Sequence, residues 1–221
     1  ALKKINLDFD GQKINGLLGP NGSGKTTLFN IIAGFLPPDE GQIILDGKDL
    51  TFLSLSKRSK LGISYLPQEP SIFRDMNVYD NIFAIAELFH LRQEAKKVTE
   101  SLINQFSLQG FQKTQGKLLS GGERRRTEIA RALASNPKFI LLDEPFAGID
   151  PIAIEEVKST VALLKKMNIG IIITDHNVKE ALSIVDYGFI IYNGEIIKSG
   201  TPQEITSDKF VKKIYLGENY Q

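Results

Sequence analysis

The feature that most constrains the fold is a glycine-rich segment that lies between a short apolar run and a helix-like stretch. Residues 13–18 are typical of a buried strand, and residues 25–35 are predicted to form a helix that ends at Gly34, before two prolines. Between them the chain reads GPNGSGKT, which fits the pattern G-x-x-x-x-G-K-[ST] at every fixed position. In such a segment, backbone N–H groups and the positive end of a helix surround phosphate oxygens. The chain is therefore predicted to bind ATP or GTP.

The positions of this segment have distinct expected roles. Lys25 would reach the β- and γ-phosphates, and the Thr26 hydroxyl would bind Mg²⁺. A lysine about 4 Å from a phosphate is worth roughly 4 kcal/mol at an effective dielectric constant of about 20, so it outweighs the formal net charge of +1. The residues predicted to bind nucleotide are Gly19, Pro20, Asn21, Gly22, Ser23, Gly24, Lys25, Thr26 and Thr27.

A second segment supplies two carboxylates. Residues 139–142 read FILL and are followed by Asp143 and Glu144. Such a run is typical of a buried parallel strand, whose carboxyl end lies at the sheet edge where these folds bind ligands. Asp143 is then predicted to lie near Mg²⁺, through a water molecule, and Glu144 near the attacking water. Taken alone, the run also fits a core strand followed by a solvated acidic turn.

Composition excludes several classes of protein. The 221 residues, 42% of them hydrophobic, predict a compact domain over residues 1–221. The chain has no apolar run of roughly 18 residues and no signal segment, so it is expected neither to span a membrane nor to be exported. The absence of cysteine excludes disulfides and thiolate chemistry and fits a reducing cytosol. The near-neutral charge argues against nucleic-acid binding, and the arginines at 124–126 are expected to form a solvated helix face.

The rest of the chain alternates between strand and helix patterns, which predicts an α/β fold with a mainly parallel sheet. Residues 42–45, followed by Asp46-Gly47, predict an antiparallel hairpin, and residues 78–106 have the apolar spacing of a helical insert. Ser120-x-x-Glu123 predicts a capping box and a helix to about residue 134. The other predicted elements are a strand at 63–66, a helix of about 16 residues after Asp150-Pro151, a strand at 169–174, a helix at 178–185, a hairpin at 189–197 and a helix capped by Thr201.

The chain contains two predicted anion sites but one acidic pair. Both the glycine loop and the start of the helix at Ser120 place a helix N-terminus where an anion is stabilised. Either Ser120 binds an unrelated anion, or it completes the site of a second copy, and two-fold symmetry then makes two composite sites. The second interpretation is favoured.

The glycine loop, LSGGE at 119–123 and FILLDE at 139–144 together resemble an ABC-type ATPase cassette. This resemblance implies a P-loop NTPase core with an antiparallel β subdomain and an inserted helical subdomain. The implied catalytic core spans residues 1–68 and 136–221, and the implied helical subdomain spans about 69–135.

The same resemblance implies roles for individual residues. Glu144 is the expected general base, Gln68 the loop glutamine that senses Mg²⁺ and water, and His176 the switch histidine near the γ-phosphate, although a lone histidine after a strand also fits a structural role. Thr26, Gln68 and Asp143 are the implied Mg²⁺ residues. The residues implied to contact the opposite subunit or its nucleotide are Ser120, Gly121, Gly122, Glu123 and Asp150.

The segments between these motifs resemble, more narrowly, the ATPase subunits of lipopolysaccharide export systems. They include YLPQEPSIFR at 65–74, VYDN at 78–81, EIARALA at 128–134 and YLGE at 215–218, so the resemblance covers essentially the whole chain. It implies a homodimer that uses ATP and Mg²⁺ beneath two transmembrane subunits, at the cytoplasmic face of an inner membrane. Lipopolysaccharide would be handled by the complex rather than bound by this chain. Phe73 and Arg74 are the implied contacts to the membrane subunits, although an aromatic residue there also fits a satellite of the core.

One expected feature is missing from this pattern, and two other interpretations remain. The aromatic ring that stacks on adenine is expected upstream of Ala1, because Phe9 lies too close to the glycine loop. ATP rather than GTP follows from the resemblance, and no [NT]-K-x-D motif, which would recognise guanine, is present.

The nearest alternative is the ATPase of another transporter, such as one for branched-chain amino-acid import. The other is a soluble ABC-type ATPase in repair, translation or iron–sulfur assembly, although the chain has neither a long coiled coil nor a second cassette.

Overall fold

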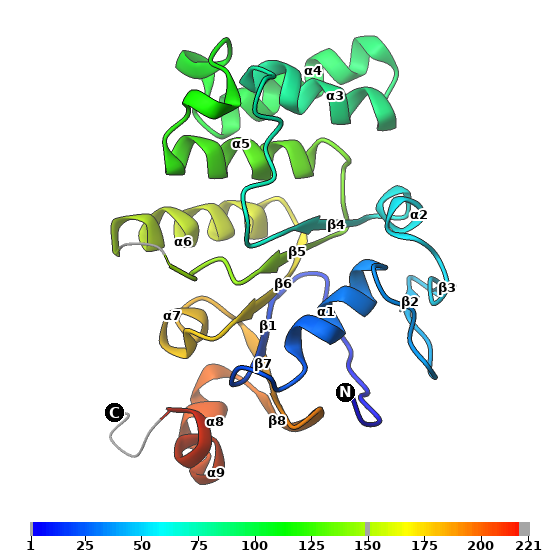
Figure 1. The fold of residues 1–221 in the computed structure, drawn as a ribbon, viewed down its shortest axis with the longest axis vertical. Coiled ribbons are helices and arrows are strands. Elements are labelled where there is room, and N and C mark those ends of the chain that lie inside the picture. Colours follow the sequence, from blue (N-terminus) through cyan, green and yellow to red (C-terminus); the bar gives the residue numbers. More distant parts are fainter. Residues whose placement is uncertain (1, 149–150, 217–221) are drawn as a thin grey trace.

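The computed structural model describes residues 2–148 and 151–216, and a mixed sheet forms the centre of this part of the chain (Figure 1). Its strands are β1 (Ile14–Leu18), β4 (Ile63–Leu66), β5 (Phe139–Asp143), β6 (Gly170–Asp175), β7 (Tyr187–Tyr192) and β8 (Glu195–Gly200). They lie in the order β4-β5-β6-β1-β7-β8, and every neighbouring pair is parallel except the β7–β8 hairpin. The predicted α/β fold with a mainly parallel sheet is therefore confirmed.

A separate two-stranded antiparallel sheet is formed by β2 (Ile44–Leu45) and β3 (Lys48–Asp49). Asp46 and Gly47 join these strands with φ angles of 50° and 75°. Two successive positive φ angles match the right-handed twist of a hairpin, and Asp-Gly adopts them readily. The predicted hairpin is confirmed, although its first strand is shorter than predicted.

Helices surround the central sheet. Those of the described chain are α1 (Lys25–Ala33), α2 (Leu55–Lys60), α3 (Val78–Phe89), α4 (Arg92–Gln105), α5 (Gly121–Leu133), α6 (Pro151–Lys166), α7 (Val178–Leu182), α8 (Pro202–Ser207) and α9 (Lys209–Val211). The predicted end of α1 at Gly34 is confirmed, because Gly34 has a φ of 92° and caps the helix, although the predicted range extended to residue 35. The prediction was wrong at the end of α7, where the chain turns into β7 and the side chain of Asp186 accepts a hydrogen bond from the backbone N–H of Ile14 (2.9 Å).

The sheet is covered on both faces, and the central strands β5 and β6 are therefore mainly apolar and buried. Leu17, Leu141 and Ile172 belong to the buried cluster that contains Leu28 and Phe29 of α1. The strand residues that alternate with these, such as Ile140, Ile171 and Ile173, belong to a second buried cluster. That cluster also contains residues of α6 and α7. Adjacent residues of a strand point to opposite faces, so each strand contributes to both clusters.

A layer of helices lies beyond the β4 edge of the sheet (Figure 1). It contains α3, α4 and α5, which pack on one another, and α5 also contacts β4. The predicted insert at 78–106 is present as two helices, because His90 and Leu91 adopt extended backbone conformations between them. The boundaries of about 69 and 135 for a helical subdomain stay a prediction.

Candidate functional site

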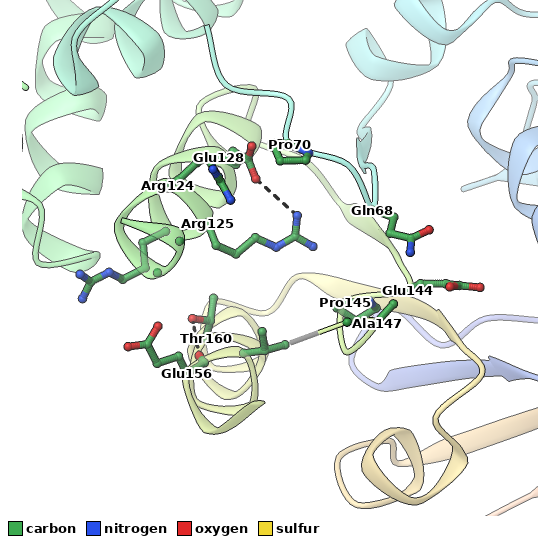
Figure 2. Close-up of a pocket in the computed structure, with 15 residues that line it drawn as sticks. Gln68, Pro70, Arg124, Arg125, Glu128, Glu144, Pro145, Ala147, Glu156 and Thr160 are labelled. Atoms are coloured by element: carbon green, nitrogen blue, oxygen red, sulfur yellow. Dashed lines mark hydrogen bonds and ion pairs between the residues drawn. The ribbon is translucent and has the colours of Figure 1, made fainter. Parts of the chain in front are cut away.

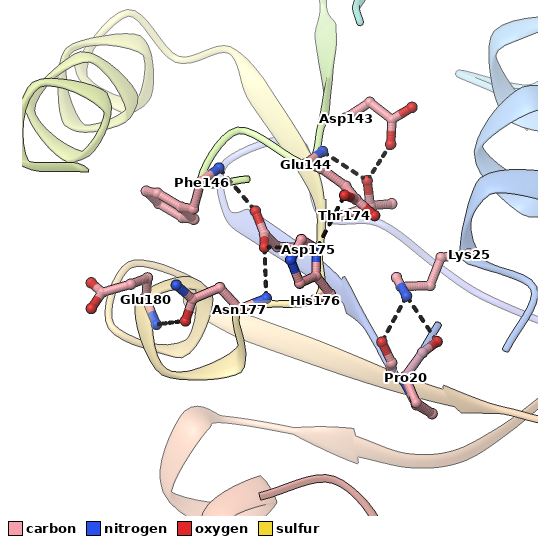
Figure 3. Close-up of polar contacts among 11 residues, drawn as sticks. Pro20, Lys25, Asp143, Glu144, Phe146, Thr174, Asp175, His176, Asn177 and Glu180 are labelled. Carbon is pink, nitrogen blue, oxygen red and sulfur yellow. Dashed lines mark hydrogen bonds and ion pairs between the residues drawn. The ribbon is translucent and has the colours of Figure 1, made fainter. Parts of the chain in front are cut away.

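The parallel strands bring three of the predicted segments to one edge of the sheet (Figure 3). Leu18, the last residue of β1, pairs with Asp175 of β6, and Asp143 of β5 pairs with Thr174. The chain therefore leaves β1, β5 and β6 on the same side. The glycine loop, the acidic pair and His176 meet at this edge.

The glycine loop forms a cradle in which two positions require glycine. Gly24 has a φ of 111°, and a Cβ atom on Gly19 would overlap the backbone carbonyl oxygen of Ile191. The β7–β8 turn closes one side, because the N–H of Gly194 donates to the carbonyl oxygen of Ser23 (2.9 Å). The Ser23 hydroxyl is buried and has no hydrogen-bond partner within the described residues. A buried unsatisfied hydroxyl beside helix N–H groups fits a phosphate oxygen.

A pocket of about 420 Å³ opens beside this cradle. Its size is within the range of small-molecule sites. It is lined by Asn21, Gly22, Gly24, Lys25, Thr26, Thr27, Glu144, Asn193 and Gly194. Sequence reasoning missed the last two residues as part of the site, because only the β1–β7 pairing brings that turn to the loop.

Lys25 is buried, with 5% of its surface exposed, and its Nζ donates to the carbonyl oxygens of Gly19 (2.6 Å) and Pro20 (3.0 Å). Burial lowers the pKa of Lys25. Three carboxylates oppose this shift, those of Glu144, Asp175 and Asp143. A phosphate in the pocket would provide a charge-assisted partner for the ammonium group.

Asp143 is held from two sides. Its Oδ1 accepts a hydrogen bond from the Thr174 hydroxyl (2.6 Å), and its Oδ2 accepts one from the Tyr65 hydroxyl (3.0 Å). Burial and the negative charge of Asp143 raise the pKa of Tyr65, which keeps the phenol protonated as a donor. Sequence reasoning missed the positioning role of Tyr65 and Thr174, because nothing local signals a contact with a strand neighbour.

The side-chain oxygens at this edge of the sheet fit a Mg²⁺ ion that is shared with a nucleotide, rather than a metal ion bound by protein side chains alone. The described residues contain no group of three or more His, Cys, Asp or Glu side chains that could hold a metal ion. Mg²⁺ in nucleotide sites is bound by one or two protein oxygens together with phosphates and water. Asp143 and the exposed side chains of Thr26 and Gln68 supply oxygens of this kind.

Two of the three predicted catalytic side chains, Glu144 and His176, contact each other. The Oε2 atom of Glu144 lies 3.1 Å from Nδ1 of His176. Glu144 has a φ of 42°, and its N–H donates to the Thr174 carbonyl oxygen (2.9 Å). The carboxylate of Asp175 accepts from the N–H groups of Phe146 (2.9 Å) and Asn177 (2.7 Å), so it joins the loops after β5 and β6. Burial raises the pKa of Asp175, and these two hydrogen bonds oppose that shift.

A second pocket of about 530 Å³ lies between α5 and the segment that connects β5 to α6 (Figure 2). Gln68, Gly121, Gly122 and Glu144 are among its lining residues, so Gln68 shares a pocket with the predicted general base. The predicted capping box is confirmed, because the Ser120 hydroxyl accepts from the Glu123 N–H (3.4 Å) and the Glu123 carboxylate accepts from the Ser120 N–H (2.9 Å). Ser120 is exposed and does not line the glycine-loop pocket. Asp150 lies outside the described residues.

The prediction of a solvated arginine face was wrong for Arg125. Its side chain is 21% exposed and donates to the Pro67 carbonyl oxygen (3.2 Å) and to the carboxylate of Glu128 (3.4 Å). Burial lowers its pKa, and the charge of Glu128 opposes this shift. Arg125 therefore joins α5 to the loop that carries Gln68.

Phe73 and Arg74 are both exposed at the surface. Phe73 keeps 43% of its surface exposed beside a groove of about 510 Å³ that lies between α2, β4, α3 and α5. The guanidinium carbon of Arg131 lies 4.6 Å from the centre of the Phe73 ring. Phe73 is therefore not a satellite of the core. Phe9, in contrast, packs edge-on against Phe189 with the ring centres 5.4 Å apart.

Comparison with known proteins gives the class of this protein. Residues 2–147 match the family model described as ABC transporter, and the chain belongs to this family of nucleotide-binding ATPases. A solved ATP-binding cassette of an ABC transporter, in its ADP conformation, matches with a TM-score of 0.87 at 30% identity, over 99% of this chain and 93% of that one.

Two curated relatives make the comparison more specific. The lipopolysaccharide export system ATP-binding protein LptB of Haemophilus influenzae is 46% identical, over 100% of this chain and 92% of its own length. LptB of Acidithiobacillus ferridurans is 48% identical over the same shares of the two chains.

Proposed function

We propose that this chain is the ATP-hydrolysing subunit of a lipopolysaccharide exporter. The observation that carries this proposal is the 46% identity to an LptB protein, which extends over the whole chain and not only over the ATPase motifs. The catalytic motifs alone fit the ATPases of many transporters, including importers of branched-chain amino acids. The segments between the motifs favour the exporter.

The geometry supports ATP with Mg²⁺ as the bound species. Lys25 and the cradle N–H groups would hold the phosphates, while Thr26, Gln68 and, through water, Asp143 would hold the metal ion. When bound, Mg²⁺ neutralises charge on the phosphate oxygens. Phosphoryl transfer to water needs mainly positioning and charge stabilisation from the protein.

Glu144 is the general base in this proposal. Its carboxylate would accept a proton from the water that attacks the γ-phosphate as ADP leaves, and the contact with His176 positions that carboxylate. Gln68 lies in the adjoining pocket with Glu144, where it orients the water.

A second copy of the chain completes each site. Within one chain, Ser120 is exposed and does not line the glycine-loop pocket. In a two-fold dimer, Ser120, Gly121, Gly122 and Glu123 would reach the nucleotide on the other copy, and Asp150 would lie at the interface. One helix N-terminus contributes about 0.3–2 kcal/mol toward an anion, so charge-assisted hydrogen bonds must add to it. The dimer should therefore be weak without ATP.

The groove beside Phe73 is the proposed contact with two transmembrane subunits. None of the helices in the described ranges qualifies as a membrane span. Phe73 lines the groove, Arg74 is the exposed residue that follows it, and both would contact a segment of a membrane subunit. The chain would then sit at the cytoplasmic face of the inner membrane. The complex, not this chain, would bind lipopolysaccharide, and no nucleic acid is involved.

The test is to purify the protein with its membrane partners and measure ATP-dependent extraction of lipopolysaccharide from proteoliposomes. Phe73→Ala should lower extraction by about 10-fold or more, because a central aromatic anchor is removed from the interface. Phe52→Ala is the matched control, since Phe52 is 82% exposed and does not line the groove. Normal partner yield and normal extraction by Phe73→Ala would contradict the assigned contact. ATP-dependent movement of a different substrate would refute the exporter itself.

A further inference from the structure

Glu128 is a buried carboxylate that the proposed chemistry does not use. It lies on α5, and only 2% of its surface is exposed. Its Oε1 accepts hydrogen bonds from the backbone N–H groups of Ser71 (2.7 Å) and Ile72 (3.1 Å). Its Oε2 pairs with Arg125 at 3.4 Å, a contact that Figure 2 shows. A buried carboxylate is costly unless it is paired and hydrogen-bonded. Loss of the backbone N–H groups or of Arg125 would therefore leave the Glu128 charge only partly compensated.

Two other side chains of α5 hold the same segment, residues 67–73. Arg125 donates to the carbonyl oxygen of Pro67, and Arg131 donates to the carbonyl oxygen (2.8 Å) and hydroxyl (2.7 Å) of Ser71. Residues 125, 128 and 131 follow at intervals of three, so they lie along one side of the helix. Glu128 is the middle member, and it contacts both the segment and Arg125.

The segment 67–73 connects the two pockets that matter for the proposed function. Glu128 lines both the pocket that contains Gln68 and Glu144 and the groove that contains Phe73. The start of the same helix carries Ser120. A displacement of Phe73 by a partner would therefore reach both Gln68 and the start of α5.

We propose that Glu128 is a positioning residue that holds the backbone of Ser71 and Ile72 on α5, so that the partner contact at Phe73, the loop of Gln68 and the start of α5 move as one body. The backbone contact is independent of the transported substrate. Its role in coupling rests on the proposed function.

The first measurement is amide hydrogen exchange of the isolated protein. In Glu128→Ala, exchange at Ser71 and Ile72 should become faster by on the order of 10-fold, because both N–H groups lose a charged acceptor. Glu128→Gln keeps a neutral acceptor oxygen and should give a smaller increase, and it also provides a variant if Glu128→Ala does not fold. The control is Glu100→Gln, the same chemical change at an exposed position of α4. Unchanged exchange at both amides in a folded Glu128 variant would overturn the proposal.

The second measurement is ATP hydrolysis by the assembled transporter. Glu128→Gln should reduce the stimulation of kcat by the membrane subunits by several-fold, while KM for ATP changes by less than about two-fold, because Glu128 does not line the glycine-loop pocket. Faster exchange with normal stimulation would show a merely structural residue and would overturn the coupling role. If the protein had no membrane partner, the proposed function would fail, and the exchange experiment would still decide whether Glu128 holds the segment.

Discussion

Arg58 provides a sharp test of how the nucleotide-binding helix is held. Its guanidinium group is buried, with 1% of the residue exposed, and it lies at the C-terminal end of α1. The group donates to four backbone carbonyl oxygens, those of Leu53 (2.9 Å), Ile31 (2.5 Å), Ile32 (2.7 Å) and Thr51 (2.8 Å). Carbonyl oxygens at the end of a helix have no partner within it, and the helix dipole favours a cation there. We expect Arg58→Met, which keeps most of the volume, to destabilise the protein strongly.

The magnitude follows from the contacts that are lost. Hydrogen bonds to charged groups are each worth about 1.5–3 kcal/mol, but four bonds to one group are not additive. Each buried carbonyl oxygen left without its donor costs about 1–3 kcal/mol, and removing the guanidinium also relieves its own desolvation, which lowers its pKa, so the net loss lies near the lower end of the summed cost. We therefore expect a loss of about 3–5 kcal/mol, against a total stability of about 5–15 kcal/mol for a typical protein. Arg58→Lys should fall between wild type and Arg58→Met, because one ammonium group cannot reach four carbonyls.

The assay is equilibrium unfolding in urea, followed by circular dichroism, without nucleotide. Arg92→Met is the matched control, since the Arg92 side chain is 80% exposed and its ion pair with Glu87 should contribute less than about 1 kcal/mol. If Arg58→Met unfolds within about 1 kcal/mol of wild type at an unchanged m-value, the carbonyls do not depend on this cation and the reasoning is refuted.

Two further predictions concern the nucleotide site. Glu144→Gln should lower ATP turnover by about 10²–10⁴-fold and trap an ATP-dependent dimer, whose mass light scattering measures. Adding Ser120→Arg to this variant should abolish the dimer but leave ATP binding by the monomer. Full turnover of the first variant, or a persistent dimer of the second, would count against the composite site. Burial lowers the pKa of Lys25 from 10.5, and a bound phosphate favours the charged form, so ATP binding should take up protons and weaken as pH rises through the lowered pKa. Calorimetry in buffers of different ionisation enthalpy measures this uptake, which Lys25→Arg should remove; equal uptake in both proteins would contradict the assignment.

Much of the fold could be predicted because its signals are local. The apolar run of β5 needs cover on both faces, and Ser120 and Glu123 form their two hydrogen bonds within one helical turn. The end of α1 has a local signal in Gly34, whereas the end of α7 was less predictable, since it depends on the hydrogen bond from the Ile14 N–H to Asp186. The arginine run looked solvated because its sequence does not show the Pro67 carbonyl or the Glu128 carboxylate that receive Arg125.

The sequence by itself determined the chemical groups of the site: a glycine cradle with Lys25, and two carboxylates at the end of a strand. Only the tertiary structure decided which groups meet. Tyr65 reaches Asp143 across 78 positions of sequence, and Glu128 reaches Ser71 across 57, because strand order and helix packing depend on which apolar faces are buried together. The same packing places Ser120 outside the glycine-loop pocket of its own chain, and no local pattern contains that information.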